Sequence, residues 1–346
     1  VLIGLLGDKT GARRRIAIVT ALCSALGLGM MLAAPGPLTF LLFHGVLLPI
    51  SWSLYGQAFS MARLVADGDS AARAGVLSTL RAGMSASYLG MLLFWAVAFA
   101  FGFDVMAVYV TGAVMSLGLL ALILTRWPAD GRAAGESAPA GPKLLQSFRD
   151  LAVPQVLLRL LCLGAVTSAG ALYMVLIPLI FDASPSRDNG DVALYVGMVA
   201  GWEVPFMLLL PRIAGRMKRT TQMVLGAAIY TCHLALLPLL TETAAVWALP
   251  LLAGFGGAAI LTLPIGYYQD LMVGRPGAAS SLIALQKLAS DILAAGAFMA
   301  GFAFGSYETT AILGTLLALA GAIGLHLADR EGLPLLPYAR RDLPLP

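Results

Sequence analysis

Long apolar segments, each close to the thickness of a lipid bilayer, follow one another along this chain. A membrane-spanning helix needs roughly 20 mostly apolar residues. Ten segments of about this length cover residues 16–33, 38–60, 76–100, 104–126, 155–180, 192–211, 220–240, 245–268, 278–303 and 307–327. Because the backbone finds no water partners inside a bilayer, each segment is expected to be a helix that bonds internally. The sequence therefore predicts an all-α polytopic membrane protein.

Composition agrees with this class. Hydrophobic residues make up 59% of the chain and charged residues 12%, whereas soluble domains carry roughly 25% charged residues. The net charge of +4 does not indicate nucleic-acid binding, because the cations lie in short loops between apolar segments. Cys23, Cys162 and Cys232 lie inside apolar segments without metal or redox spacing. We therefore expect no metal and no cofactor.

The distribution of Lys and Arg predicts which loops are cytoplasmic. If the polar stretch 4–15 is cytoplasmic, successive crossings place 19 of the 22 Lys and Arg on that same side. The opposite side holds Arg187, while Arg81 and Lys287 fall within apolar segments. This asymmetry satisfies the positive-inside rule. We expect the 4–15 loop and the C-terminus to face the cytoplasm.

One long polar stretch divides the apolar segments into a group of four and a group of six. Residues 128–150 are rich in Ala, Gly, Pro and charge, which is typical of a flexible linker. We therefore expect an N-terminal bundle at 1–127, a cytoplasmic linker at 128–150, a C-terminal bundle at 151–328 and a cytoplasmic tail at 329–346.

The loop near the N-terminus carries a spaced pattern of glycine, acid and cations. Gly4, Asp8, Gly11, Arg13 and Arg14 fit G-x-x-x-D-x-x-G-x-[RK]-[RK]. This pattern resembles the signature loop between the second and third helices of the major facilitator superfamily; any polar turn between two spans is the alternative. Gly7 and Gly11 would permit a tight reversal of the backbone.

An internal repeat supports the resemblance. The stretch that ends at Arg219 overlays the 4–15 loop with a shift of 204, and Lys287 follows Arg81 by 206 positions. The resemblance implies two pseudo-symmetric six-helix bundles with a substrate site between them. It also implies that this copy is N-terminally incomplete, holding about 10 of 12 helices without the first and most of the second.

Further stretches resemble the sugar efflux transporter family within that superfamily. They are QAFSMARLVAD (57–67), VLSTLRAG (76–83), FGFDVMAVY (101–109), GWEVPFML (201–208) and YYQDLMVGRPGAASSL (267–282). The resemblance implies a monomeric, proton-coupled exporter of sugars or sugar-like molecules that works by alternating access in a bacterial inner membrane. One departure is Met91, which stands where exporters commonly carry the proline of a Gly-Pro pair.

Four charged residues lie within the predicted spans, where a charge costs roughly 2.5–3.5 kcal/mol at the helix centre. They are Arg81, Glu203, Lys287 and Asp291. Lys287 and Asp291 are one helical turn apart, so they share a face and can neutralise each other. The resemblance makes Arg81 the expected partner of Glu203 and gives Glu203 a proton-carrying role. Structural ties between helices are the alternative for all four.

The resemblance also implies roles for the loop and for neutral polar residues. Asp8, Gly11 and Arg13 would latch the cytoplasmic side closed, with the acid docking near Pro276 and Gly277. Aromatic rings stack on sugars and amides bind their hydroxyls, so candidate substrate contacts are Trp52, Tyr55, Gln57, Tyr173, Tyr267, Gln269 and Gln286. Interfacial belt positions are the alternative for the aromatic residues.

Other classes of function are weighed against transport. No Ser/His, paired-Asp or HExxH arrangement is present in the sequence, so we do not expect an enzyme. A sensor with a transporter-like fold would normally carry a soluble effector domain, for which neither the linker nor the tail is long enough. Export of a drug-like or amphipathic small molecule is the closest alternative to sugar efflux.

Overall fold

The computed structural model describes residues 3, 6–7, 10–65, 70–104, 106–127, 151–187, 189–214, 217–272 and 276–330. All regular secondary structure in these ranges is helical. The predicted linker 128–150 and the tail from residue 331 onward lie outside the described residues.

The helices follow the predicted spans closely. The first group is α2 (Arg13–Ala33), α3 (Pro37–Leu42), η1 (Phe43–Leu47), α4 (Leu48–Val65), α5 (Ser70–Ala100) and α6 (Met106–Arg126). The second is α8 (Pro154–Asp182), α9 (Asn189–Ala214), α10 (Arg219–Leu240), η2 (Ala244–Ala248), α11 (Leu249–Leu271), α12 (Pro276–Ala303) and α13 (Tyr307–Ala328). In the described ranges, nine helical stretches are long and apolar enough to cross a membrane.

One predicted span is built from three consecutive pieces. The stretch 37–65 contains the short helix α3, the π-helical turn η1 and then α4. A π-helical turn inserts an extra residue into the helix and locally rotates the side chains that follow it. Phe43, which begins η1, is buried against Gly27 of α2. The turn thus coincides with a close contact between neighbouring helices.

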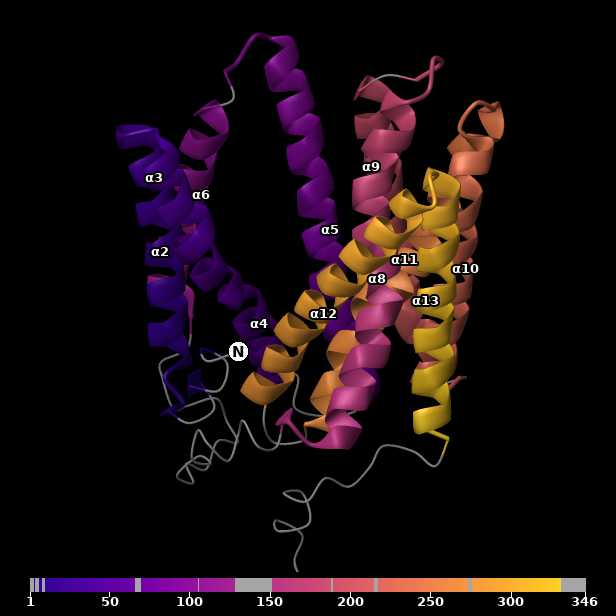
Figure 1. Ribbon diagram of the computed structural model, residues 1–346. Coiled ribbons are helices and arrows are strands. Elements are labelled where there is room, and N and C mark those ends of the chain that lie inside the picture. Colours follow the sequence, from indigo (N-terminus) through magenta and orange to yellow (C-terminus); the bar gives the residue numbers. More distant parts are fainter. Residues whose placement is uncertain are drawn as a thin grey trace, which may run out of the picture. The chain divides into compact units, whose positions relative to one another are not determined.

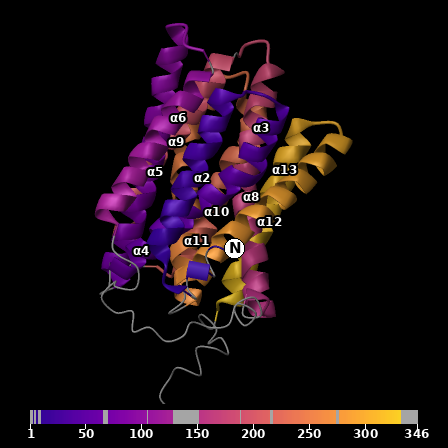
Figure 2. The same cartoon turned by 90° about the vertical axis from the view of Figure 1, so that its left-hand side faces the viewer.

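Contacts group the chain into two compact units. The first unit comprises Val1–Asp67, Leu93–Phe148 and Gly274–Ser281. Within it, α2 packs on α4 and α6 (Figures 1 and 2). Its core contains Ala17, Ala21 and Ile123, and a hydrogen bond of 2.8 Å joins Ser24 to Ser116. Small residues on α2 allow α6 to approach closely.

The second unit comprises Gly68–Leu92, Arg149–Val273 and Leu282–Pro346. In it α8 packs on α13, α10 packs on α11 and α13, and α11 packs on α9. Glycines set the closest approaches: Gly226 and Gly256 meet at the contact between α10 and α11, and Gly321 of α13 meets α8 at Cys162. Such small residues let helix backbones come together where lipid supplies no hydrophobic drive.

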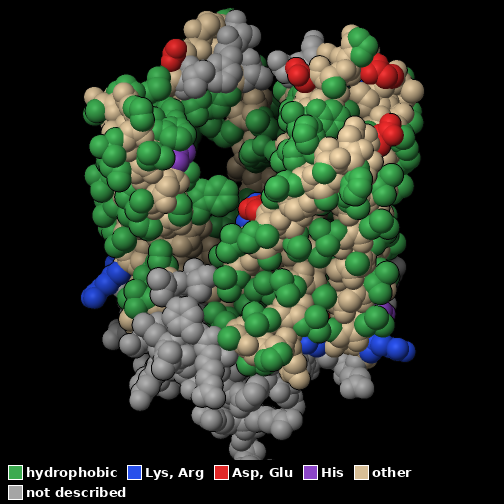
Figure 3. Space-filling view, in the orientation of Figure 1, with side chains coloured by type: hydrophobic (Ala, Val, Ile, Leu, Met, Phe, Trp, Pro, Cys, Tyr) green, Lys and Arg blue, Asp and Glu red, His purple; other side chains and the backbone are tan. Residues whose placement is uncertain are grey.

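Apolar side chains cover the flanks of the helices, and most charged side chains in this view lie near helix ends (Figure 3). Described cations occur at the start of α2, α8 and α10 and at the end of α6, α9 and α13. Arg187 lies at the opposite end, after α8, where it donates to the carbonyl oxygens of Thr241 and Thr243. This alternation along the chain fits one cytoplasmic and one external side.

Candidate functional site

The loop before α2 forms a tight turn. Gly11 has φ +64°, with no heavy atom within 4 Å of an added Cβ, so the left-handed backbone alone requires glycine there. The φ of Gly7 is not positive, so the prediction that both glycines permit the reversal holds for Gly11 and is wrong for Gly7, which lies in a helical turn. Gly11 N–H donates to Gly7 O at 2.9 Å. Asp8 lies outside the described residues.

Cations after the turn fasten it to the first unit. Arg13 is the first residue of α2 and is buried. Arg14 donates from Nη2 to the carbonyl oxygen of Leu124 on α6 at 2.5 Å. The loop and the start of α2 are therefore held against the end of α6.

On α4 the predicted polar residues have different surroundings. Gln57 is buried, and its amide lies 3.5 Å from the position of a Cβ added at Gly7, so it lies next to the turn. The ring of Tyr55 lies 4.8 Å from that of Phe59 in a tilted arrangement, whereas Trp52 is 67% exposed. One helix thus carries a residue that supports the loop and another that is open to its surroundings.

The same helix meets the beginning of α12 within the first unit. Ser60 donates to Ser280 at 3.3 Å, and a Cβ added at Gly56 would lie 2.8 Å from Ser280 Cβ. Only a residue without a side chain allows α4 this close to α12 at that point. The predicted docking region, Pro276 and Gly277, begins this same helix.

Glu203 lies on α9 in the second unit, facing the first part of α5. Its Oε2 accepts a hydrogen bond of 3.1 Å from the hydroxyl of Ser85. On its other side, a Cβ added at Gly257 of α11 would lie 2.9 Å from Oε1. Glycine at 257 therefore makes room for the carboxylate.

The predicted contact between Arg81 and Glu203, which transport would make and break, stays a prediction. Among the described residues Arg81 forms no ion pair, although its charge acts on the Glu203 carboxylate. Ser85 follows Arg81 by one helical turn on the same face of α5, and its hydroxyl, rather than the guanidinium, contacts the acid. Glu203 is thus held by a neutral donor.

Lys287 and Asp291 form an ion pair on α12, as their spacing predicted. Their side chains are 61% and 50% exposed. Next to Lys287 in the sequence, the side-chain amide of Gln286 donates to the hydroxyl of Thr167 on α8 at 3.2 Å. Gln286 thus fastens α12 to α8 beside the ion pair.

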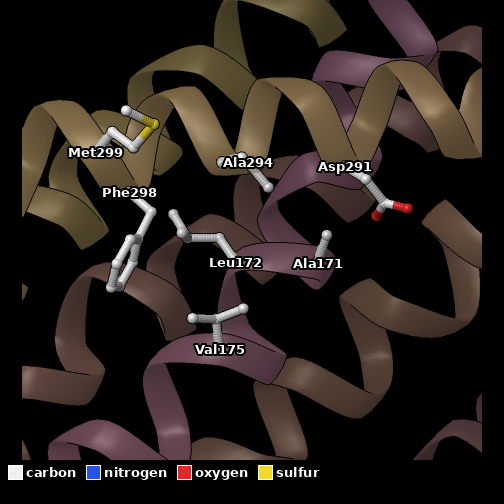
Figure 4. Close-up of a pocket in the computed structure, with 8 residues that line it drawn as sticks. Ala171, Leu172, Val175, Asp291, Ala294, Phe298 and Met299 are labelled. Carbon is white, nitrogen blue, oxygen red and sulfur yellow. The ribbon is translucent and has the colours of Figure 1, made fainter. Parts of the chain in front are cut away.

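A cavity of about 370 Å³ lies between α8 and α12 in the second unit. Apart from one carboxylate its lining is apolar, formed by Ala171, Leu172, Val175, Asp291, Ala294, Ala295, Phe298 and Met299. Asp291 lies at one end of the group and Phe298 and Met299 at the other (Figure 4). This cavity can hold an apolar group and place one polar group at the acid.

The remaining predicted contacts lie in the interior of the second unit. Tyr173 is buried in its core, and Gln269 is buried near the end of α11. Tyr267 donates from its hydroxyl to Asp329 Oδ2 at 2.6 Å. The structure therefore pairs Lys287 with Asp291 and bonds Gln286 of the same helix to α8, while Tyr173 and Tyr267 are buried elsewhere.

Sequence reasoning missed the ion pair to which Tyr267 belongs. Arg159 Nε of α8 donates to Asp329 Oδ1 at 2.8 Å, Nη2 lies 2.8 Å from the same oxygen in an ion pair, and the two side chains are each 5% exposed. Nη2 also donates to Ala328 O at 2.7 Å and Nη1 to Gln155 O at 2.9 Å. We call Arg159, Asp329 and Tyr267 the basal cluster. The sequence did contain a signal for this pair. Arg159 lies near the start of one predicted span, Asp329 follows the end of another, and both are on the predicted cytoplasmic side.

Removal of the ion pair on α12 tests whether its members stabilise each other. Loss of one partner leaves the other charge without a counter-ion, whereas loss of both leaves a neutral turn. We expect the double variant Lys287→Met, Asp291→Leu to lose less thermal stability than the sum of the two single variants. Melting of the four purified proteins gives the coupling, and additive losses would show that the pair does not act as a unit.

The long apolar helices, the two units and the charges inside the spans define a multi-pass α-helical membrane protein. Residues 1–295 match the family described as Major Facilitator Superfamily. The chain belongs to this superfamily, and it is a transporter rather than an enzyme.

Curated relatives carry a narrower name. The chain is 29% identical over 279 residues to sugar efflux transporter A of Dickeya chrysanthemi, covering 80% of this chain and 68% of the relative. It is 28% identical over the same length to sugar efflux transporter B of Salmonella typhimurium, with the same coverage. The resemblance to the sugar efflux transporter family is confirmed.

Solved structures share the fold. The fucose:proton symporter of E. coli superposes with a TM-score of 0.68 at 16% identity, over 95% of this chain and 86% of that one. The human organic anion transporter TETRAN gives 0.70 at 14% identity, over 94% and 79%. These likenesses confirm the major facilitator fold.

Proposed function

We propose that the protein is a secondary active transporter that exports sugars or sugar-like small molecules in exchange for protons. It would act as a monomer in a bacterial inner membrane and open alternately to its two sides. The names of the curated relatives, which are sugar efflux transporters, support the substrate class. The charges inside the spans support ion coupling, because a charged residue is costly there and is usually present only where it serves a function.

The surroundings of Glu203 are the observation that supports the coupling proposal. Its carboxylate accepts a hydrogen bond from the neutral Ser85, and Arg81 acts on it without contact. A carboxylate tied to a cation stays ionised, whereas one held by a hydroxyl can gain and lose a proton as its surroundings change. Motion that alters the distance to Arg81 would change the proton affinity of Glu203 during transport.

The Lys287–Asp291 pair and Gln286 are proposed to bind the polar part of the substrate. Carboxylate, ammonium and amide groups together offer donors and acceptors for hydroxyl groups. The cavity that begins at Asp291 would receive the apolar part. Trp52, which is exposed on α4, stays a separate candidate for stacking on a sugar ring.

The loop before α2 is proposed to be the cytoplasmic latch. Gly7 lies beside Gln57 of α4, and three residues further along α4 Ser60 bonds to Ser280 of α12. The loop and the start of α12 are thus supported by one helix of the first unit. Asp8, Gly11 and Arg13 are proposed to act there by docking on the start of α12 and releasing it.

Glu203→Gln in proteoliposomes tests the coupling. Gln keeps the hydrogen bond from Ser85 but cannot exchange a proton. We expect exchange of labelled substrate across the membrane to continue, while accumulation driven by a pH gradient falls at least tenfold. A panel of radiolabelled mono- and disaccharides supplies the substrate, and Ser87→Ala, on the exposed face of α5, is the control. Undiminished accumulation in the Glu203 variant would remove this residue from the mechanism.

Export of amphipathic molecules is the second candidate, favoured by the apolar lining of the cavity. Leu172, Val175 and Phe298 offer contacts to alkyl or aromatic groups but no hydrogen bonds. Competition assays separate the two classes. If unlabelled sugars inhibit transport of the labelled substrate and hydrophobic cations do not, the sugar-efflux proposal stands. The reverse result would assign the protein to the amphipathic class.

A further inference from the structure

Four polar rings lie together in the middle of the second unit. They are Tyr173 on α8, Tyr195 on α9, and Tyr230 and His233 on α10, and each side chain is 0–4% exposed. His233 Nε2 and the Tyr195 hydroxyl lie 3.0 Å apart. The His233 ring is 5.2 Å from that of Tyr173 and 5.4 Å from that of Tyr230. We call these residues the ring cluster.

The polar atoms of the ring cluster are not needed for packing. Phenylalanine would fill the same volume without burying hydroxyl or imidazole groups, which cost free energy when they lack partners. Tyr173 Oη is buried and has no hydrogen-bond partner among the described residues. His233 Nδ1 is buried without a full hydrogen bond from those residues, and the backbone of Tyr230 acts on the His233 ring. Each can exchange a hydrogen bond with a water molecule, as buried polar groups commonly do.

The ring cluster extends to Glu203. An added Cβ at Gly257 would lie 2.9 Å from Glu203 Oε1 and 3.5 Å from Tyr230 Cε2, so the acid and this ring flank one glycine. The charge of Glu203 acts on the hydroxyl groups of Tyr173 and Tyr230. Among the described residues, the titratable groups packed against His233 are Tyr173, Tyr195 and Tyr230, and Glu203 and Tyr88 act in turn on the Tyr173 hydroxyl.

The cluster also extends toward the end of the unit where α9 begins. Tyr195 precedes Glu203 by eight residues on α9, which is about 12 Å along the helix axis. Beyond Tyr195, the ring of Trp247 lies 6.2 Å away, and Arg187 lies over Trp247 at 5.4 Å. Arg187 belongs to the loop predicted to face the external side. Polar groups thus occur at short intervals from that loop to the middle of the span.

We propose that Tyr195, His233 and Tyr173 form a proton relay that connects Glu203 with the external side of the membrane. The proposal rests on the proposed coupling role of Glu203. The Tyr195 hydroxyl passes its proton to His233 Nε2 and takes a proton from the external side in its place. The proton on Nδ1 then leaves through water to Tyr173, and the Tyr173 proton reaches the Glu203 carboxylate.

Every step of this relay forms one O–H or N–H bond and breaks one, so no co-reactant is consumed. Glu203 gains one proton, and each tyrosine ends as it began. His233 changes from one neutral tautomer to the other and re-equilibrates before the next transfer. Histidine suits this position because its two nitrogens can accept and donate on opposite edges of one ring.

The relay predicts an effect on the rate of protonation of Glu203 rather than on its extent. Infrared difference spectroscopy of proteoliposomes after an external pH jump follows the carboxyl band of Glu203, assigned by its loss in Glu203→Gln. We expect Tyr195→Phe and His233→Phe to slow the appearance of this band at least tenfold while its final amplitude is unchanged. Tyr268→Phe is the matched control, because this tyrosine is equally buried, its hydroxyl has no partner in the described part of the chain, and it belongs to α11 outside the cluster.

Two outcomes would contradict the relay, and they can be told apart. If the Glu203 band appears at the wild-type rate in Tyr195→Phe, protons reach the acid by another route and only the relay fails. If wild type shows no Glu203 band at any pH, both the coupling role of Glu203 and the relay that serves it fail. Tyr195→Phe removes a single oxygen atom and decides the matter even if His233→Phe does not fold.

Discussion

Asp329→Asn is expected to lower the free energy of unfolding by about 3–5 kcal/mol, the usual cost of stranding one member of a buried ion pair. Asp329 accepts one hydrogen bond from Arg159 Nε and one from Tyr267, and Arg159 Nη2 pairs with it at 2.8 Å. Asparagine keeps the shape but loses the charge, which leaves the Arg159 guanidinium in a region 5% exposed without a counter-ion. Unfolding by SDS in mixed micelles measures the loss.

Two companion variants distinguish this cause from a general loss of packing. Tyr267→Phe removes only one hydrogen bond to the carboxylate and should cost about 1.5–3 kcal/mol. The double variant Arg159→Met, Asp329→Leu removes both charges, so it should be more stable than Asp329→Asn alone. A loss below about 1 kcal/mol in Asp329→Asn would place the basal cluster among solvated surface pairs.

Gly256→Ala is expected to cost about 1–3 kcal/mol, which is typical of overpacking in a close-packed interior. The added Cβ would lie 2.6 Å from both Gly226 O and Tyr230 N on α10, and 2.7 Å from Tyr230 Cβ. Two of these three neighbours are backbone atoms, so no side-chain rotation relieves the contact. The helices α10 and α11 must move apart. Thermal unfolding in detergent measures the effect.

A second glycine of the same unit supplies the control. Gly296 lies within α12, and nothing lies within 4 Å of a Cβ added there. Gly296→Ala should therefore be neutral or stabilising by up to about 1 kcal/mol, because alanine favours the helix. Equal losses in the two variants would show that helix propensity, rather than the contact between α10 and α11, decides the outcome.

Hydropathy predicted the ends of every membrane-spanning helix in the described ranges to within six residues. The differences lie mainly at helix ends: α9 covers 189–214 where 192–211 was expected, and α5 begins at Ser70 where residue 76 was expected. Hydropathy detects only the part of a helix that crosses hydrocarbon, whereas backbone hydrogen bonds continue the helix into polar sequence.

The candidate site was predicted where it depends on spacing within one helix and missed where it depends on contacts between helices. Lys287 and Asp291 are paired as their separation of four residues requires. By contrast, the choice of Ser85 over Arg81 as partner of Glu203 depends on the level along α5 at which α9 meets it. The hydrogen bond from Tyr267 to Asp329 joins residues 62 positions apart, and no periodicity in the sequence records such a contact.

The basal cluster has a consequence for biosynthesis. Arg159 and Asp329 are 170 positions apart, and a ribosome makes the arginine long before its partner. During that interval α8 carries a cation whose burial is unfavourable. The end of the second unit that contains Arg159 can therefore close only when the last helix has left the ribosome. In a chain released before residue 329, Arg159 would lack its counter-ion and this end would stay open. Membrane proteases could recognise the incomplete chain by that exposed end.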